Sequence, residues 1–121
     1  MTAVPVSRLD FLGPVAPRWC LGCGYFGCFK ELTSVVAKSG IPREKIIVVS
    51  GIGCSSRLPY YTKTFGFHTL HGRAATIAQG IKKTRPDLCV WMVTGDGDAF
   101  SIGTNHMVHL LRRNPDIKIL M

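Results

Sequence analysis

Several features that assign a sequence to a common class of protein are missing from this chain of 121 residues. No apolar run approaches the roughly 18 residues of a membrane helix, and the first residues lack the apolar stretch of roughly 7–15 residues that a secretory signal needs. The Gly-Lys-Ser/Thr ending of a Walker loop occurs nowhere, which excludes a nucleotide site of that kind. These absences predict a cytoplasmic protein without membrane contact.

Acidic residues are scarce, since the sequence has 7 of them against 15 lysines and arginines, for a formal net charge of +8. Small basic clusters lie at residues 82–85 and 112–113, near the ends of predicted helices, where cations suit the helix dipole. Most of this charge is expected on solvated surface; the alternative is attraction for a diphosphate, a carboxylate substrate or an acidic protein. No basic stripe with interleaved aromatic residues is present, so no nucleic-acid partner is expected.

What the sequence does contain is an alternation of strand and helix patterns. Apolar residues at helical spacing predict helices over residues 25–39, 73–85 and from Ser101 or Thr104 to about Arg113. Solidly apolar runs predict strands over residues 45–50, 88–94 and 116–121. This order predicts an α/β fold, a parallel sheet with helical crossovers that is covered on both faces.

The length predicts one domain. Residues 1–24, rich in proline and glycine, are interpreted as an extended arm that carries Cys20 and Cys23, and residues 25–121 as the α/β domain. Because the chain stops on an apolar strand, the domain is expected to be truncated at its C-terminal end.

Two unusual stretches follow the first two predicted strands, SGIGCSS at residues 50–56 and GDGD at residues 95–98. Ligands of open parallel sheets bind at the carboxyl ends of the strands, so both stretches are expected at one site. The segment 51–72 is far longer than the roughly 2–6 residues of an ordinary connection and is interpreted as a functional loop.

Three of the five cysteines lie in turns or loops with glycines nearby, namely Cys20, Cys23 and Cys54. Cys28 and Cys89 are expected in the core of a helix and a strand. Three thiolates need a fourth ligand: iron–sulfur clusters usually take four cysteines, and structural zinc takes four cysteines or three and a histidine. His68 or His71 could complete a zinc site, so the pattern leaves both metals open. A thioredoxin-like pair fits poorly, because that motif belongs near a βαβ pattern and this one follows an arm.

The stretch TGDGDAFSIG leaves an apolar strand and enters a helix. Glycines let the backbone approach a ligand, a helix start offers N–H groups to phosphate, and Mg²⁺ prefers oxygen ligands. We therefore expect Asp96 to bind a cation, against the alternative of a tight turn with a hydrogen-bonded aspartate. His106 and His109 share a helix face and are interpreted as packing or surface residues.

Five motifs in order, WCLGCG, SGIGCSSRLPYY, HTLHGRA, GDGD and IGTNHMVHLLRRN, resemble the β subunits of 2-oxoacid:ferredoxin oxidoreductases, most of all the 2-oxoglutarate form. The resemblance covers nearly the whole chain after residue 17. It implies a thiamine-diphosphate-binding fold and the oxidative decarboxylation of a 2-oxoacid such as 2-oxoglutarate or pyruvate. Coenzyme A would take the acyl group, and a 4Fe–4S cluster would pass the electrons to ferredoxin.

The resemblance also implies roles for particular residues. Cys20, Cys23 and Cys54 would be cluster ligands, which favours iron–sulfur over zinc. Asp96 would bind Mg²⁺, and the thiamine-diphosphate contacts would be Ile52, Gly53, Cys54, Ser55, His71, Gly97 and Asp98. The fourth cysteine and the asparagine that completes the Mg²⁺ site are expected beyond residue 121.

The resemblance implies an α subunit as partner, in a heterodimer or heterotetramer, that supplies the glutamate activating the cofactor. No catalytic residue is expected in this chain, which should be inactive alone. Two alternatives compete: a binding module whose Cys-x-x-Cys holds structural zinc, and a 2-oxoacid decarboxylase that transfers no electrons to ferredoxin.

Overall fold

The computed structural model describes residues 7–121, and the first six residues of the predicted arm lie outside them. Four parallel strands form one sheet in the order β2-β1-β3-β4. The strands are β1 (Ile46–Ser50), β2 (Phe65–His68), β3 (Cys89–Val93) and β4 (Ile117–Leu120). The longer helices are α1 (Tyr25–Lys38), α3 (Ala74–Thr84) and α4 (Thr104–Arg113), and α2 (Leu58–Tyr61) is a single turn. The short helical turns are η1 (Arg8–Phe11), η2 (Arg43–Lys45), η3 (Ser55–Arg57) and the π-helical η4 (Gly97–Ile102).

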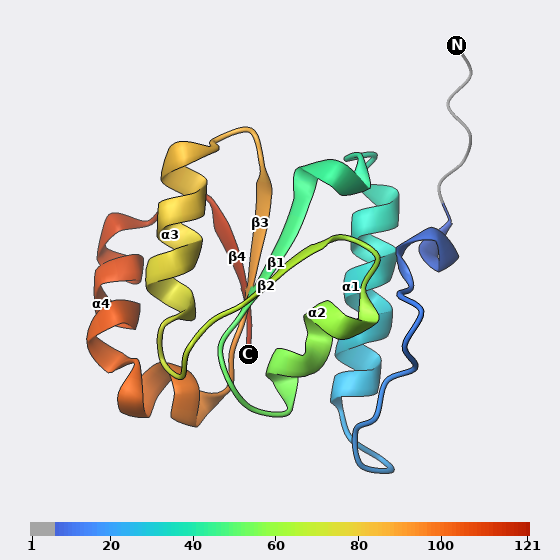
Figure 1. Cartoon of the computed structure of the whole chain (residues 1–121), viewed down its shortest axis with the longest axis horizontal. Helices are drawn as coiled ribbons and strands as arrows, with labels where there is room; N and C mark the ends of the chain where they lie inside the picture. Colours follow the sequence, from blue (N-terminus) through green and yellow to red (C-terminus); the bar gives the residue numbers. More distant parts are fainter. Residues whose placement is uncertain (1–6) are drawn as a thin grey trace.

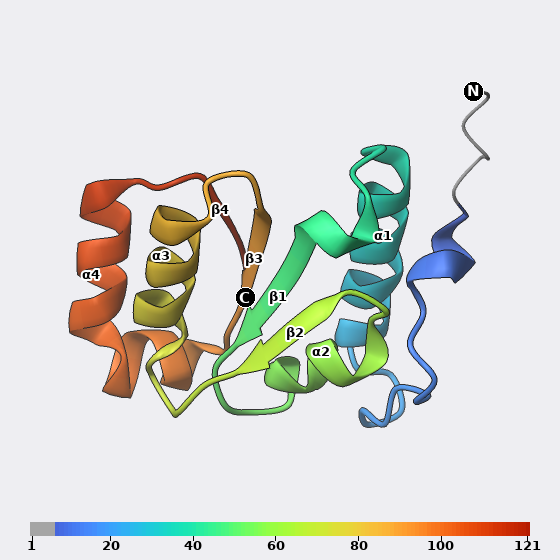
Figure 2. The ribbon, with the colours of Figure 1, turned by 45° about the horizontal axis from the view of Figure 1, so that its top comes forward.

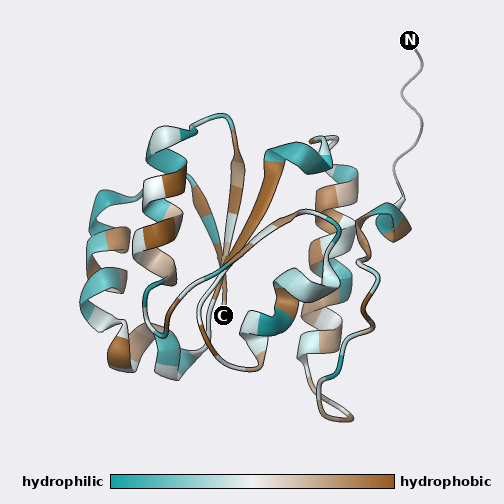
Figure 3. Cartoon of the chain, viewed as in Figure 1, coloured by the Kyte–Doolittle hydropathy of each residue, from teal (hydrophilic) through white to brown (hydrophobic). Residues whose placement is uncertain are grey.

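The sheet is the middle of three layers. Helices α1 and α2 lie on one side of it and α3 and α4 on the other, and the described part of the arm runs along α1 (Figures 1 and 2). Strands β1 and β3 are mostly apolar, whereas much of α4 is hydrophilic (Figure 3). The α/β prediction with helical crossovers is confirmed.

Alternate side chains of the central strands enter two separate cores. Val48 and Val93 pack with α1 and α2, while Val49 and Met92 pack with α3 and α4, and all four are essentially inaccessible to solvent. Successive side chains of a strand point to opposite faces, so a sheet covered on both faces needs apolar residues at every position. This is why β1 and β3 are solid apolar runs.

The predicted functional loop over residues 51–72 is not one loop, which corrects that interpretation. It contains η3, α2 and the edge strand β2, which pairs in parallel with β1. All four residues of β2 are exposed, so the strand lacks the continuous apolar signal of a buried strand. Gly66 lies against Pro59 of α2, and this contact helps to close the short crossover.

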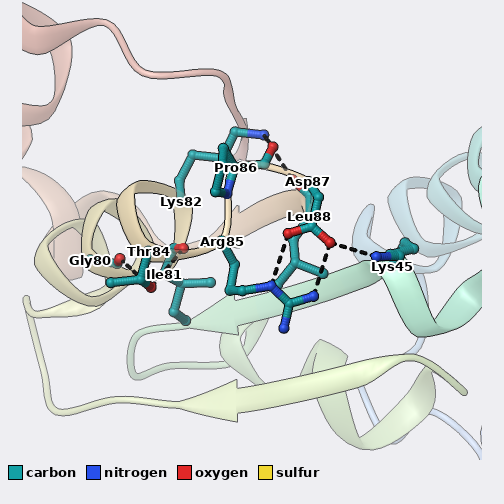
Figure 4. Close-up of polar contacts among 9 residues, drawn as sticks. All are labelled: Lys45, Gly80, Ile81, Lys82, Thr84, Arg85, Pro86, Asp87 and Leu88. Atoms are coloured by element: carbon teal, nitrogen blue, oxygen red, sulfur yellow. Dashed lines mark hydrogen bonds and ion pairs between the residues drawn. The ribbon is translucent and has the colours of Figure 1, made fainter.

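An ion-pair cluster lies at the amino ends of β1 and β3, away from the unusual stretches (Figure 4). The carboxylate of Asp87 accepts hydrogen bonds from Lys45 Nζ at 2.5 Å and from Arg85 Nε at 2.8 Å. The Arg85 and Lys45 hydrogen bonds hold the pKa of Asp87 well below its ordinary value. All three side chains are substantially exposed, so this cluster contributes little to stability.

Across residues 7–121, no helix combines the length and the apolar character needed to cross a membrane.

Candidate functional site

The ends of β1 and β3 meet, as the sequence predicts. The Gly51 N–H donates a hydrogen bond to the Val93 carbonyl at 3.1 Å. Further along, a methyl group at Gly95 would lie 3.6 Å from Ser55 Oγ. The start of α1, the segment after β1 and η4 follow the same lower edge in Figure 1. The Cys54 turn and the Gly-Asp-Gly-Asp turn are therefore neighbours at one edge of the sheet.

Asp98 ties three segments together at this edge. Its carboxylate is buried, with 2% of the side chain exposed. One oxygen accepts from the Gly72 N–H at 2.6 Å and from His71 Nδ1 at 2.5 Å, and the other accepts from Thr94 Oγ1 at 2.7 Å. The end of β3, the loop before α3 and the first turn of η4 are thus fixed to one another.

Burial and hydrogen bonding have opposite effects on the pKa of the Asp98 carboxyl. Burial on its own would raise the pKa of the Asp98 carboxyl, but the hydrogen bonds from Thr94, Gly72, His71 and the Ile52 N–H outweigh burial and lower the pKa. Asp98 is therefore a carboxylate at neutral pH, and it holds the His71 ring through Nδ1. The Nε2 atom of this half-exposed ring is left for another partner.

Asp96 differs from Asp98 in its exposure and in its hydrogen bonding. It is exposed at the start of η4, and its carboxylate has no hydrogen-bond partner among residues 7–121. It follows the buried end of β3 and precedes a helical segment, as the sequence predicts. A free carboxylate beside two glycines fits a divalent cation that takes its other oxygen ligands from phosphate and water.

The described part of the arm reaches the same edge through Trp19. The Trp19 Nε1–H donates a hydrogen bond to the Cys54 carbonyl oxygen at 2.6 Å. The indole is buried, and its ring lies 5.0 Å from that of Tyr61 and 5.4 Å from that of Phe26, centre to centre. Cys20 directly follows Trp19, so this bond anchors the Cys-x-x-Cys turn beside the Cys54 turn. The role of Trp19 could not be predicted from the sequence, because only the folded chain places its indole against a residue 35 positions away.

The thiols of Cys20, Cys23 and Cys54 suit a metal centre in their chemistry. All three are free, Cys20 and Cys54 are exposed, and Cys23 is half-buried. Within the part of the chain that the structure describes, no three His, Cys, Asp or Glu side chains are grouped as a metal site requires. Cysteine is the usual ligand of an iron–sulfur cluster, so the fit is one of ligand chemistry and not of an observed arrangement.

The other cysteines and histidines are placed as follows. Cys28 and Cys89 are half-buried rather than fully in the core, with Cys89 packed against the core on the α1 side. His68 does not join the thiols: its Nδ1 bonds to Ser50 Oγ at 2.9 Å, and its ring stacks on Tyr60 at 4.2 Å. His106 is half-buried and His109 exposed.

Gly51 is expected to be irreplaceable, because a methyl group there would overlap the Asp98 carboxylate. We expect Gly51→Ala to lower the free energy of unfolding by about 1–3 kcal/mol, the usual cost of overpacking. Urea denaturation followed by circular dichroism measures this. Gly80→Ala is the control, since a methyl at this exposed position in α3 meets nothing within 4 Å. Equal stability of the two variants would contradict the packing argument.

Comparison with known proteins agrees with this geometry. Residues 43–121 match the family described as thiamine pyrophosphate enzyme, C-terminal TPP binding domain. The chain belongs to the thiamine pyrophosphate enzymes. The match includes the Cys54 and Asp96 turns but not Cys20 and Cys23, which lie before it.

Individual relatives of this chain extend the similarity to the N-terminal arm. Subunit KorB of the 2-oxoglutarate oxidoreductase of Mycobacterium tuberculosis is 50% identical over 120 residues, 99% of this chain and 32% of that protein. Subunit beta of the 2-oxoacid:ferredoxin oxidoreductase 2 of Aeropyrum pernix is 45% identical over 115 residues, 95% of this chain and 37% of that protein. The chain thus spans about a third of the length of these relatives.

One solved structure shows the same fold. It is the 2-oxoglutarate:ferredoxin oxidoreductase from Magnetococcus marinus with 2-oxoglutarate, coenzyme A and succinyl-CoA bound. The TM-score is 0.92 at 44% identity, covering 98% of this chain and 40% of that one. The resemblance to the β subunits of 2-oxoacid:ferredoxin oxidoreductases is confirmed.

Proposed function

We propose that this chain is the cofactor-binding part of the β subunit of a 2-oxoglutarate:ferredoxin oxidoreductase, which forms an acyl-CoA and CO₂ and reduces ferredoxin. The Trp19–Cys54 hydrogen bond carries the proposal, because it joins the Cys-x-x-Cys turn to the carboxyl end of the strands, where open parallel sheets bind ligands, in the part of the chain that matches a TPP binding domain. The names of the relatives support the choice of substrate and electron acceptor.

When bound, thiamine diphosphate supplies the carbon nucleophile that adds to a 2-oxoacid, and the iron–sulfur cluster accepts the released electrons one at a time. The chain's own residues hold and orient these groups. Asp96 would offer its free carboxylate to Mg²⁺, and the backbone of Ile52, Gly53, Ser55 and Gly97 would contact the diphosphate. The free Nε2 of His71 would be available to the cofactor, and the buried Asp98 would act by positioning His71.

Cys20, Cys23 and Cys54 hold the cluster in this proposal, with the fourth ligand outside the chain described here. The Cys54 turn contacts both sites, because Cys54 precedes Ser55, whose hydroxyl lies beside Gly95. Residues 54 and 55 would thus hold the two cofactors close together. The α subunit completes the active site, and the protein acts in the cytoplasm.

The Mg²⁺ role of Asp96 is tested by Asp96→Ala in the protein assembled with its α subunit. We expect the Kd for thiamine diphosphate with Mg²⁺ to rise at least 10–100-fold, roughly the cost of losing even an outer-shell partner of a metal. Isothermal titration calorimetry measures the Kd. Asp87→Ala, at the opposite end of the strands, should leave it unchanged. An unaltered Kd in Asp96→Ala would assign the metal to another residue.

Metal content distinguishes the proposed function from a zinc-stabilised binding module. Protein purified without oxygen should be brown and contain iron and acid-labile sulfide. Colourless protein with stoichiometric zinc would support the binding module instead.

A further inference from the structure

The edge strand β2 has one face that no element within residues 7–121 fully covers. Gly66 faces α2, where it lies against Pro59. Side chains alternate along a strand, so Phe65 and Phe67 face the opposite side of the sheet, the side of α3. Helix α3 packs its alanines on the central strands β1 and β3, and the two phenylalanines of β2 remain 61% and 46% exposed.

A groove of about 420 Å³ lies between this face of β2 and helix α3. We call it the β2–α3 groove. Its apolar lining is Phe67, Leu70 and Ile77, and its polar lining includes Arg73 and Thr76. Leu70 is 77% exposed, and all three apolar side chains are in contact with solvent. Exposed apolar side chains that stand together, rather than singly, mark interaction sites. The groove therefore suits the apolar side chains of another protein segment.

The charge at the β2–α3 groove is positive. Arg73 lines the groove, and none of the ion pairs within residues 7–121 involves its guanidinium. The sequence has no acidic residue between Glu44 and Asp87, the stretch that supplies both walls. Lys83 and Arg113 line the neighbouring groove between α3 and α4. Complementary charge favours an acidic partner, whereas a second copy of this chain would bring the same positive charge to the contact.

We propose that the β2–α3 groove binds a segment of the α subunit that carries apolar side chains and a carboxylate that faces Arg73. The inference rests on the proposed function, in which the α subunit completes the active site. Arg73 directly follows Gly72, whose N–H donates a hydrogen bond to Asp98 at the candidate site. The groove is therefore continuous with the edge of the sheet that the α subunit would cover.

The occupant of the groove can be identified by photo-crosslinking in the complex of the protein with its α subunit. Phe67 is replaced by p-benzoylphenylalanine, which keeps an aromatic ring at this exposed position. We expect irradiation to link residue 67 to a peptide of the α subunit that contains aspartate or glutamate, identified by mass spectrometry. A link to a second copy of the chain, a link within the same chain, or no link at all would overturn the inference.

The charge of the partner segment is tested by Thr76→Glu and Thr76→Lys. Both variants lose the hydroxyl that bonds to the Arg73 carbonyl oxygen at 2.8 Å, so they differ only in the charge that they bring to the groove. We expect the Kd for the α subunit, measured by isothermal titration calorimetry, to be at least about tenfold higher in Thr76→Glu than in Thr76→Lys, because like charges that meet across an interface oppose binding.

The outcomes of the charge test separate this inference from the proposed function. Equal Kd values for the two variants, with normal binding of the α subunit by the wild-type protein, would overturn the inference alone. A wild-type protein that does not bind the α subunit would refute the proposed function, and this inference with it.

Discussion

Replacing Cys54 by alanine is expected to leave the assembled protein without its brown colour and unable to reduce ferredoxin. The variant loses one of the three thiolates that the proposed function assigns to the cluster. Ferredoxin reduction should fall on the order of 100-fold or more, because even outer-shell changes at metal sites cost roughly 10–100-fold. Decarboxylation of the 2-oxoacid, measured as CO₂ release, should persist.

Cys54→Ala is a clean test because the fold does not depend on the thiol. Trp19 bonds to the backbone carbonyl of Cys54, which alanine keeps, and the side chain is exposed. Cys89→Ala is the control, since a half-buried cysteine on a strand should leave iron content unchanged. Ferredoxin reduction at the wild-type rate in Cys54→Ala would show that the electrons take a path that does not involve this residue.

Replacing Asp98 by asparagine should have the largest effect on stability. The carboxylate accepts from Thr94, Gly72 and His71 while almost fully buried. An amide nitrogen in place of one oxygen would face a donor, and hydrogen bonds to charged groups contribute about 1.5–3 kcal/mol each. We expect the free energy of unfolding at pH 7 to fall by about 3 kcal/mol, measured by urea denaturation without added cofactors.

The loss in Asp98→Asn should depend on pH in a defined direction. The folded pKa of Asp98 is lower than its ordinary value, and the unfolded value is about 3.9. The carboxylate therefore contributes its full stabilisation above about pH 4, and this contribution disappears as the pH falls further, through the folded pKa. Wild type and variant should converge in acid.

Asp96→Asn is the matched control for this experiment. It lies in the same turn, is exposed, and makes no side-chain hydrogen bond within residues 7–121. Its stability should stay within about 0.5 kcal/mol of wild type, as for ordinary surface changes. If both variants were equally stable at every pH, Asp98 would not be the tie that we describe.

Together these variants separate two roles within one short turn. The Asp96 carboxylate is exposed to solvent, where a cation can reach it. The Asp98 carboxylate accepts hydrogen bonds from His71, Thr94 and the backbone, and so has no oxygen left for a metal. The sequence pattern predicts both at the cofactor. It could not separate them, because the difference depends on which carboxylate the chain folds over.

The central sheet could be predicted from the sequence because its physics is local. Solid runs such as IIVVS and CVWMV occur where both faces of a strand are covered, and helical spacing marked the crossovers. The edge strand β2 could not be predicted, since an exposed strand needs no apolar run and its existence depends on pairing with β1.

The candidate site, too, could be predicted from the sequence only in part. The sequence by itself determined the residue types of the candidate site, three loop cysteines and a glycine-flanked aspartate, and the edge of the sheet at which the Cys54 and Asp96 turns lie. Only the tertiary structure decided that Trp19 anchors the arm to Cys54 and that Asp98 supports His71. The chemistry of a side chain is fixed by its residue type, whereas its burial and hydrogen-bond partners come from segments distant along the chain, which only folding brings together.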